Sequence, residues 1–381
     1  MLGEDPGGML RDEEGCRRDG DGVREDVGGR QEEMATATRG GNWAAYLGLA
    51  GLAATALAHP GGDVRAEFRA REEHLNNPQR RTMGSCRRSL EESGHFEGEL
   101  SRRMEKIGNI RRDLGLANPS GPVLDKRQAR AGCVLDPEVT EGPFWVQGEL
   151  IREDIREKAP GVVLHLDVNV IDVSTCKPIP DVYVELWGCN STGVYTGVVS
   201  KGNGNGVAAP EEIKNSALRG IQATNGKGVA SFVTVVPGHY VGRANHLHTI
   251  IHHSASKLEN NTIRGGTISH VGQFYFEQAL LRSVEGNMPY ATNKQVLTTN
   301  AADFLYKQGF GNGDNPVIDI TMLGASVADG LHGVIDVGVD PRAVRKPQPV
   351  NMWTKAGGVP VPGSPWSGYP WTKAVRKWLG L

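Results

Sequence analysis

The chain changes its hydrophobic pattern at residue 132. Beyond it, VVLHLDVNVIDV (162–173) alternates apolar and polar positions with period two, and VYVELWG (182–188) alternates again after KPIPD. Period-two alternation bounded by Pro, Gly and Asp is typical of half-buried β-strands. The pattern continues in GVASFVTVVPG, NHLHTIIHH, VIDITML and LHGVIDVGV. Many short strands with turn signals predict an antiparallel β-sandwich over residues 131–340, with a hairpin about KPIPD.

The segment from 64 to 116 has a different, helical spacing. Its apolar positions recur every three or four residues within a highly charged stretch, at Leu90, Phe96, Leu100, Met104 and Ile107. This spacing predicts an amphipathic helix. We therefore expect residues 59–130 to form a helical arm and linker that lies on the domain or on a partner, with a homodimer through the arm as one possibility.

The two ends of the chain do not have the pattern of a packed domain. Residues 1–33 are mostly Gly, Arg, Asp and Glu, which predicts a disordered extension, or a gene-model extension if Met34 is the true start. Residues 34–58 contain one arginine, an apolar run and the small-residue pattern Ala-Leu-Ala, which together predict a signal peptide cleaved after Ala58. The apolar run is short for a transmembrane helix, and a signal anchor is the alternative. The Pro, Gly and Trp-rich residues 341–381 predict an irregular tail.

The composition and net charge of the chain indicate which kinds of binding partner to expect. The 381 residues carry a formal net charge of -2, which implies no strong field toward nucleic acid or an anionic membrane. With 51 Gly and 21 Pro, the chain suits a β-rich fold with many turns. We expect a secreted, extracellular protein without stable membrane insertion and without a nucleic-acid partner.

The cysteines agree with secretion. Apart from Cys16 in the extension, four remain, and their even number is compatible with two disulfides. In the predicted hairpin, Cys176 and Cys189 would lie roughly 25 Å apart, whereas bridged Cα atoms lie within about 7 Å. We therefore predict Cys86–Cys176 and Cys133–Cys189. Sequons at Asn190 and Asn260 could carry glycans.

The stretch YVGRANHLHTIIHH (240–253) concentrates potential metal ligands. On a strand, His246 and His248 point to the same face, with Cα atoms roughly 6.5 Å apart, so both imidazoles can reach one ion. His252 shares this face but lies roughly 13 Å beyond His248, and His253 points to the other face. Four strand histidines satisfied by hydrogen bonds remain the alternative interpretation.

Two tyrosines flank this strand in sequence, each in a loop. Tyr240 follows VVPGH, where Pro and Gly end a strand, and Tyr195 lies in CNSTGVYTG after the strand that ends at Trp187. A loop tyrosine is usually a surface residue. Taken with His246 and His248, however, the tyrosines complete a set of two phenols and two imidazoles.

Three stretches together resemble one enzyme family. CVLDPEVTEGPFWVQGELIREDI, PIPDVYVELWGCNSTGVYTG and GVASFVTVVPGHYVGRANHLHTII resemble the intradiol ring-cleavage dioxygenases, notably their secreted fungal branch, from about Cys133 to Phe276. The resemblance implies a non-haem Fe(III) ion and assigns roles by position. The metal ligands would be Tyr195, Tyr240, His246 and His248, with Tyr240 as the axial ligand that departs; Arg243 and Gln273 would be catalytic; Pro143, Phe144 and Trp145 would be pocket walls.

The implied chemistry fits these residue types. Ferric iron is hard and highly charged, so it favours phenolate oxygen and can deprotonate a tyrosine whose free pKa is about 10. Two neutral imidazoles complete the protein ligands without adding charge. The implied reaction inserts both atoms of O2 between the hydroxyl-bearing carbons of a catechol-type ring and gives a muconate-type diacid, with Arg243 stabilising developing negative charge. The sequence leaves open whether catechol, hydroxyquinol or protocatechuate is preferred.

Two other classes stay open. A two-His-one-carboxylate Fe(II) oxygenase would need an Asp or Glu beside the histidine pair, and none is well placed after it. A secreted β-sandwich binding module with a degenerate metal site would keep the fold without the activity. Iron content and catechol-dependent O2 uptake separate the three.

Overall fold

A computed structural model describes residues 83–116, 139–200, 202–309, 315–364 and 366. Every described residue belongs to one compact unit. The predicted extension (1–33) and signal peptide (34–58) lie outside the described residues. Among the helices that are described, none combines the length and the apolar character that a membrane span requires.

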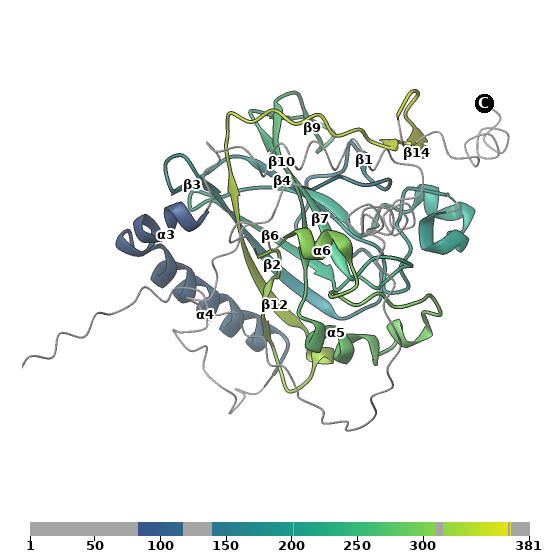
Figure 1. Ribbon diagram of the computed structural model, residues 1–381, viewed down its shortest axis with the longest axis horizontal. Coiled ribbons are helices and arrows are strands. Elements are labelled where there is room, and N and C mark those ends of the chain that lie inside the picture. The colour runs from purple at the N-terminus through teal and green to yellow at the C-terminus, as the bar shows by residue number, and fades with distance from the viewer. Residues whose placement is uncertain (1–82, 117–138, 201, 310–314, 365, 367–381) are drawn as a thin grey trace, which may run out of the picture. The chain divides into compact units, whose positions relative to one another are not determined.

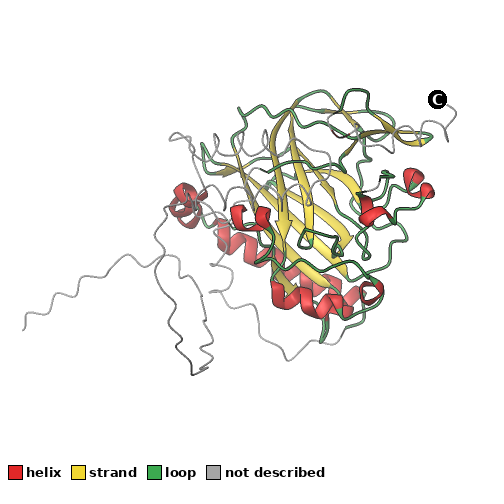
Figure 2. Ribbon diagram, turned by 45° about the vertical axis from the view of Figure 1, so that its right-hand side comes forward, coloured by secondary structure: helices red, strands yellow, loops and turns green. Residues whose placement is uncertain are grey.

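Two β-sheets form the body of the molecule (Figures 1 and 2). The first is antiparallel, in the order β10 (Thr267–Tyr275), β7 (His246–His253), β4 (Tyr183–Trp187) and β5 (Arg219–Ala223). The second has the order β11 (Asp319–Met322), β12 (Leu331–Val339), β2 (Val163–Asp172) and β3 (Lys177–Pro178), with β6 (Val229–Val235) also paired to β2. The predicted mainly-β sandwich is confirmed, although β2 and β12 pair in parallel rather than antiparallel.

Short elements connect the strands. Two of them are the helices α5 (Gln278–Glu285) and α6 (Phe304–Gly309), and the others include the 3₁₀ turns η1 (Asn203–Gly206), η2 (Pro210–Lys214), η3 (Tyr290–Thr292) and η5 (Val327–Asp329). Strands β8 (Ser256–Lys257) and β9 (Ile263–Arg264) form a small hairpin of their own.

Strand alternation places the core between the two sheets. On β2 the even-numbered positions from Leu164 to Val170 are fully buried, and they join Val184, Leu186, Leu247 and Ile251 of the first sheet in one hydrophobic cluster. Full burial of each such side chain contributes about 1.5–3 kcal/mol. Because Leu247 and Ile251 face this core, the neighbouring positions on β7 must face the opposite side of the sheet.

The predicted hairpin about KPIPD is wrong, because β2 and β4 belong to different sheets. Strand β2 turns instead at residues 174–176 and pairs with the short β3; the Asp172 carboxylate accepts a bond of 2.7 Å from the Ser174 amide. Asp181, with φ 57°, then redirects the chain to the other sheet. Alternation identifies which face of a strand is buried, but it does not identify the neighbouring strand.

The predicted irregular tail (341–381) contains regular structure. Strands β13 (Asn351–Thr354) and β14 (Gly357–Pro360) form a hairpin, and β13 pairs in parallel with β1 (Val146–Gln147). Gly357, with φ 101°, makes the turn possible, because a Cβ there would lie 2.3 Å from the Ile213 carbonyl oxygen. Residues 367–381 lie outside the described residues.

The predicted helical arm is present as α3 (Met83–Glu92) and α4 (His95–Asp113). As predicted, Leu90 and Ile107 are buried, but Met104 is 47% exposed. Charged residues take its place against the second sheet: Arg103 Nη1 lies 2.6 Å from Asp319 Oδ2 and Lys106 Nζ lies 2.5 Å from Asp167 Oδ1. The arm therefore docks on a polar sheet face, which an analysis of apolar spacing cannot detect.

One disulfide joins the arm to the sandwich. Cys86 and Cys176 are bonded, with Cα atoms 5.1 Å apart, which confirms this predicted pair. Cys189 is instead a buried free thiol whose Sγ donates to the Gly238 carbonyl, contrary to the predicted Cys133–Cys189 bond. Cys133 itself lies outside the described residues.

Candidate metal centre

Strand β7 presents its first two histidines, His246 and His248, on the outer face of the first sheet. His246 and His248 are each about 1% exposed, and they alternate with Leu247 in the sandwich core. Trp187 of β4 stacks on His248 with ring centroids 4.8 Å apart and an angle of 4° between the planes. The predicted strand parity is therefore present, and the histidines are covered rather than exposed to water.

Both loop tyrosines are buried as well. Asn203 holds the Tyr195 loop by accepting from the Tyr195 amide and by donating to the Tyr195 carbonyl, both at 2.7 Å. Tyr240 enters from a tight turn in which the Arg243 amide donates to the Tyr240 carbonyl. Tyr195 is fully buried and Tyr240 is 4% exposed, so neither is a surface tyrosine.

The four predicted ligands converge at their tips. Tyr195 Oη lies 3.1 Å from His248 Nε2 and 3.4 Å from His246 Nε2; Tyr240 Oη lies 3.3 Å from His246 Nε2; the two Nε2 atoms are 3.1 Å apart. Nitrogen and oxygen ligands typically lie about 2.0–2.2 Å from a transition metal, so that neighbouring donors around one ion are roughly 3.0–3.5 Å apart. The spacing of the four atoms fits a single metal ion.

The protonation of His246 also fits. Its Nδ1 lies 2.6 Å from the Ala244 carbonyl oxygen. A carbonyl can only accept, so Nδ1 carries the proton and the Nε2 of the neutral ring keeps its lone pair. A backbone carbonyl behind the ring fixes both the tautomer and the ring orientation, as it does for many metal-binding histidines.

The phenols need a cation to ionise. Burial raises the pKa of Tyr240 to about 12, and burial together with Tyr240 raises the pKa of Tyr195 well above its ordinary value. Both side chains are therefore neutral in the protein alone. A highly charged cation between them would reverse this preference, because its own charge dominates the local field.

Arg243 adds a permanent charge beside the donors. It is fully buried, its Nε donates to Asp303 Oδ2 at 3.0 Å, and its Nη1 lies 3.4 Å from His246 Nε2. Burial alone would lower the pKa of Arg243, but the Asp303 carboxylate outweighs it and the pKa is raised. The guanidinium is thus a fixed cation aimed at the site.

Gln273 joins the same network through Arg243. On β10, Gln273 lies opposite His248 and Tyr275 lies opposite His246. Arg243 Nη2 donates to Gln273 Oε1 at 2.5 Å and to the Tyr275 hydroxyl at 2.7 Å, and that hydroxyl donates to Gln273. The structure therefore brings both predicted catalytic side chains to the metal ligands.

Asp303 and Tyr275 were missed at the sequence level. Asp303 precedes FLYKQG, and its Oδ1 accepts from the amides of Leu305 and Tyr306 at the start of α6. An aspartate at that position predicts a helix cap, and the structure shows that cap. The sequence gives no sign that the same side chain also binds Arg243, 60 residues away. Tyr275 lies two residues after Gln273 on β10, so strand alternation could have predicted that both side chains point to the same face.

The three predicted wall residues make different contacts. Phe144 stacks on Tyr195 with centroids 4.5 Å apart and meets Tyr240 edge-on at 6.2 Å, so it does line the centre. Trp145 is directed elsewhere: its Nε1 donates to Glu185 Oε1 at 2.8 Å. Pro143 is buried beside them.

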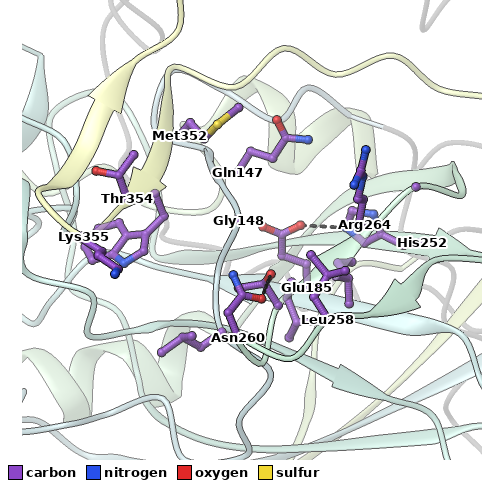
Figure 3. Close-up of a pocket in the computed structure, with 16 residues that line it drawn as sticks. Gln147, Gly148, Glu185, His252, Leu258, Asn260, Arg264, Met352, Thr354 and Lys355 are labelled. Carbon is purple, nitrogen blue, oxygen red and sulfur yellow. Dashed lines mark hydrogen bonds and ion pairs between the residues drawn. The ribbon is translucent and has the colours of Figure 1, made fainter.

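A separate pocket of about 620 Å³ lies over the far end of β7 (Figure 3). His252 and Glu185 form part of its wall, and His252 Nε2 lies 2.7 Å from Glu185 Oε2, as the dashed line in the figure shows. Arg264, Met352 and Lys355 stand around them. His252 thus has a carboxylate partner of its own, away from the four converging donors.

A carboxylate alternative finds no support at this centre. Among the described residues, His95, Glu99 and Asp336 on α4 and β12 are the one group in which three or more His, Cys, Asp or Glu ligand atoms lie close together. A two-His-one-carboxylate site would have brought an acid to His246 and His248. The donor set at β7 is two phenols and two imidazoles.

Comparison with known proteins finds similar chains among the solved structures. No protein-family model matches the chain, and no curated protein does. Among solved structures, an intradiol ring-cleavage dioxygenase from Tetranychus urticae is 29% identical, covering 58% of this chain and 100% of that one, with a TM-score of 0.46. The dioxygenase domain of a carbohydrate-binding fusion from Streptomyces sp. SirexAA-E is 22% identical, covering 54% and 98%, with a TM-score of 0.36. Catechol 1,2-dioxygenase from Acinetobacter sp. ADP1 is 18% identical, covering 81% and 92%, with a TM-score of 0.35.

Proposed function

We propose that the chain is a secreted non-haem Fe(III) intradiol dioxygenase that cleaves a catechol-type ring between its two hydroxyl-bearing carbons. The observation that carries the proposal is the convergence of Tyr195, Tyr240, His246 and His248, whose donor atoms are 3.1–3.4 Å apart in four pairs, beside the buried guanidinium of Arg243. Two phenols with two imidazoles are a donor set for a hard, highly charged ion. The three sequence motifs support the same assignment.

Each residue of the centre would have its own role in the reaction. A bound ferric ion would supply Lewis acidity and make the diphenol electron-rich toward O2. A diphenol that binds as a dianion would release two protons: Tyr240 Oη would take one, because burial favours the neutral form of this phenol, and solvent would take the other. Arg243, held by Asp303, would stabilise negative charge on the ring oxygen, and Gln273 is oriented by Arg243.

The surroundings of the centre favour this chemistry. The four donors and Arg243 are at most 4% exposed, so water is largely excluded and electrostatic interactions are strengthened. Phe144 lies flat against Tyr195 and edge-on to Tyr240, which gives a planar ring an apolar wall beside the ligands. The proposed substrate is therefore a small aromatic diol, with O2 as the second substrate.

Secretion is part of the proposal. The Cys86–Cys176 disulfide supports it, because such bonds persist in oxidising compartments. The apolar segment of residues 34–58 supplies the expected signal. Expression from Met34 in a secreting host should yield mature protein in the medium, beginning at residue 59, whereas cell-retained protein with an intact segment would contradict it.

Iron content and colour test the metal assignment. The purified protein should hold one iron per chain and absorb in the visible through tyrosinate-to-iron charge transfer, and a catechol added without oxygen should shift the band. His246→Ala and His248→Ala should each lose most of the iron and of the catechol-dependent O2 uptake. His253→Ala, on the opposite face of β7, is the matched control and should keep both. An iron-replete but colourless protein would contradict the two-tyrosine assignment.

A further inference from the structure

A second group of possible metal ligands lies between the arm and the other sheet. His95 and Glu99 are one helical turn apart on α4, so their side chains share a face of the helix. Asp336 lies on β12, which α4 covers (Figures 1 and 2). One ligand atom from each of the three lies within 4.8 Å of the others. The group thus joins an arm element to a sandwich element.

The imidazole in this group has an unsatisfied nitrogen. Nε2 of His95 is buried and has no hydrogen-bond partner among the described residues. A buried nitrogen without a partner destabilises the folded state unless something binds it. The carboxylates of Glu99 and Asp336 are suitable ligands for a cation that would also bind His95 Nε2.

The carboxylates also lack full charge compensation. Asp336 is 5% exposed, and its Oδ1 accepts a bond of 2.7 Å from Asn169 Nδ2, which fixes its orientation. Burial, and then the neighbouring Asp336, raise the pKa of Glu99 to about 8. The positive charges of Arg102 and Arg103 attract the Glu99 carboxylate, but Arg103 is itself paired with Asp319 at 2.6 Å. Two acids that approach each other in this way need a proton or a cation.

We propose that His95, Glu99 and Asp336 bind one divalent transition-metal ion, with Zn²⁺ as the probe, and that this ion fastens α4 to the sandwich. One histidine nitrogen and two carboxylate oxygens are ordinary zinc ligands, and water completes the coordination in sites with three protein ligands. Around one ion the donor atoms would be roughly 3.0–3.5 Å apart. Binding would therefore draw the three ligand atoms, which lie within 4.8 Å of one another, closer together. The site is independent of the ferric centre, which is built on the other sheet.

Zinc titration of the full-length, iron-loaded protein tests the site. After desalting, metal analysis should find one zinc per chain in addition to the iron, and the melting temperature should rise by about 5 °C or more when free Zn²⁺ is 100-fold above its Kd. Glu99→Gln and His95→Ala should each abolish the extra zinc and the shift. Glu97→Gln, an exposed acid on the same helix, is the matched control and should retain both.

Zinc bound at the ferric centre is a distinguishable outcome. The His246→Ala variant, in which that centre is impaired, should still take up the arm zinc with an unchanged melting shift. If zinc uptake disappears in His246→Ala but persists in Glu99→Gln, the zinc binds at the β7 centre instead of the arm, and the proposal fails. Wild-type protein that takes up no zinc beyond its iron also overturns it. Far-UV circular dichroism establishes that every variant is folded, and iron content does so for the variants on the arm.

Discussion

Removing Asp303 should destabilise the protein strongly, because it takes away the carboxylate that compensates the buried charge of Arg243. The two side chains are 1% and 0% exposed, and Asp303 Oδ2 accepts from Arg243 Nε at 3.0 Å and from the Ala244 amide at 2.8 Å. Its Oδ1 accepts from two amides at the start of α6. Asp303→Ala therefore loses four hydrogen bonds at once.

The expected magnitude follows from these contacts. Breaking a buried pair by removal of one partner costs about 3–5 kcal/mol, and loss of a helix cap adds about 1 kcal/mol. For a domain of about 150–250 residues, 1 kcal/mol corresponds to roughly 2–4 °C in melting temperature. We expect Asp303→Ala to melt at least about 8 °C below wild type, as measured by differential scanning fluorimetry.

An exposed pair provides the control. Asp340 lies 2.9 Å from Arg342, but the two side chains are 39% and 79% exposed, so Asp340→Ala should cost less than about 1 kcal/mol. The double variant Arg243→Met/Asp303→Ala should recover part of the loss, because no buried charge is left unpaired. Equal melting temperatures for Asp303→Ala and Asp340→Ala would refute the reasoning.

Three further predictions concern other parts of the molecule. His252→Ala should keep its iron but melt several degrees lower, because buried Glu185 loses the partner at 2.7 Å; iron loss would place His252 at the metal. Burial, and then the charge of His332, lower the pKa of His165 to about 4, so the contribution of this residue to stability is full above pH 6.5 and is lost as the pH falls toward 4. The melting temperature of His165→Gln should therefore fall less than that of wild type between pH 6.5 and pH 4. If the two proteins differ in melting temperature by the same amount at both pH values, the assignment is wrong. Asn260 is exposed, whereas Asn190 Oδ1 accepts from the amides of Thr192 and Val194, so peptide mapping of protein from a secreting eukaryotic host should find a glycan at Asn260 and none at Asn190.

Short-range features could be predicted from the sequence because they depend on local geometry. Strand parity alone places His246 and His248 on one face and excludes His253 from it. The same reasoning places His252 too far along the strand, and its bond to Glu185 agrees. The Cys86–Cys176 pair was also predicted, although the hairpin used in that reasoning does not exist.

Long-range partners could not be predicted in this way. Asp303 is 60 residues from Arg243, and nothing in FLYKQG distinguishes a helix cap from a guanidinium partner. The alternation in β2 and β4 is compatible with pairing in one sheet or with two facing sheets. On α4, charged Arg103 is buried and apolar Met104 is 47% exposed, because the sheet beneath the helix is itself polar.

The Cys86–Cys176 bond closes a covalent loop across 90 residues of chain. In the chain-entropy description, a loop of that length stabilises the folded state by about 4–5 kcal/mol, by restricting the unfolded chain. It also means that a protease cutting once inside the loop does not separate the products. The arm of a nicked molecule would still be attached to the sandwich, and the cut would become visible only on a reducing gel, as two bands in place of one.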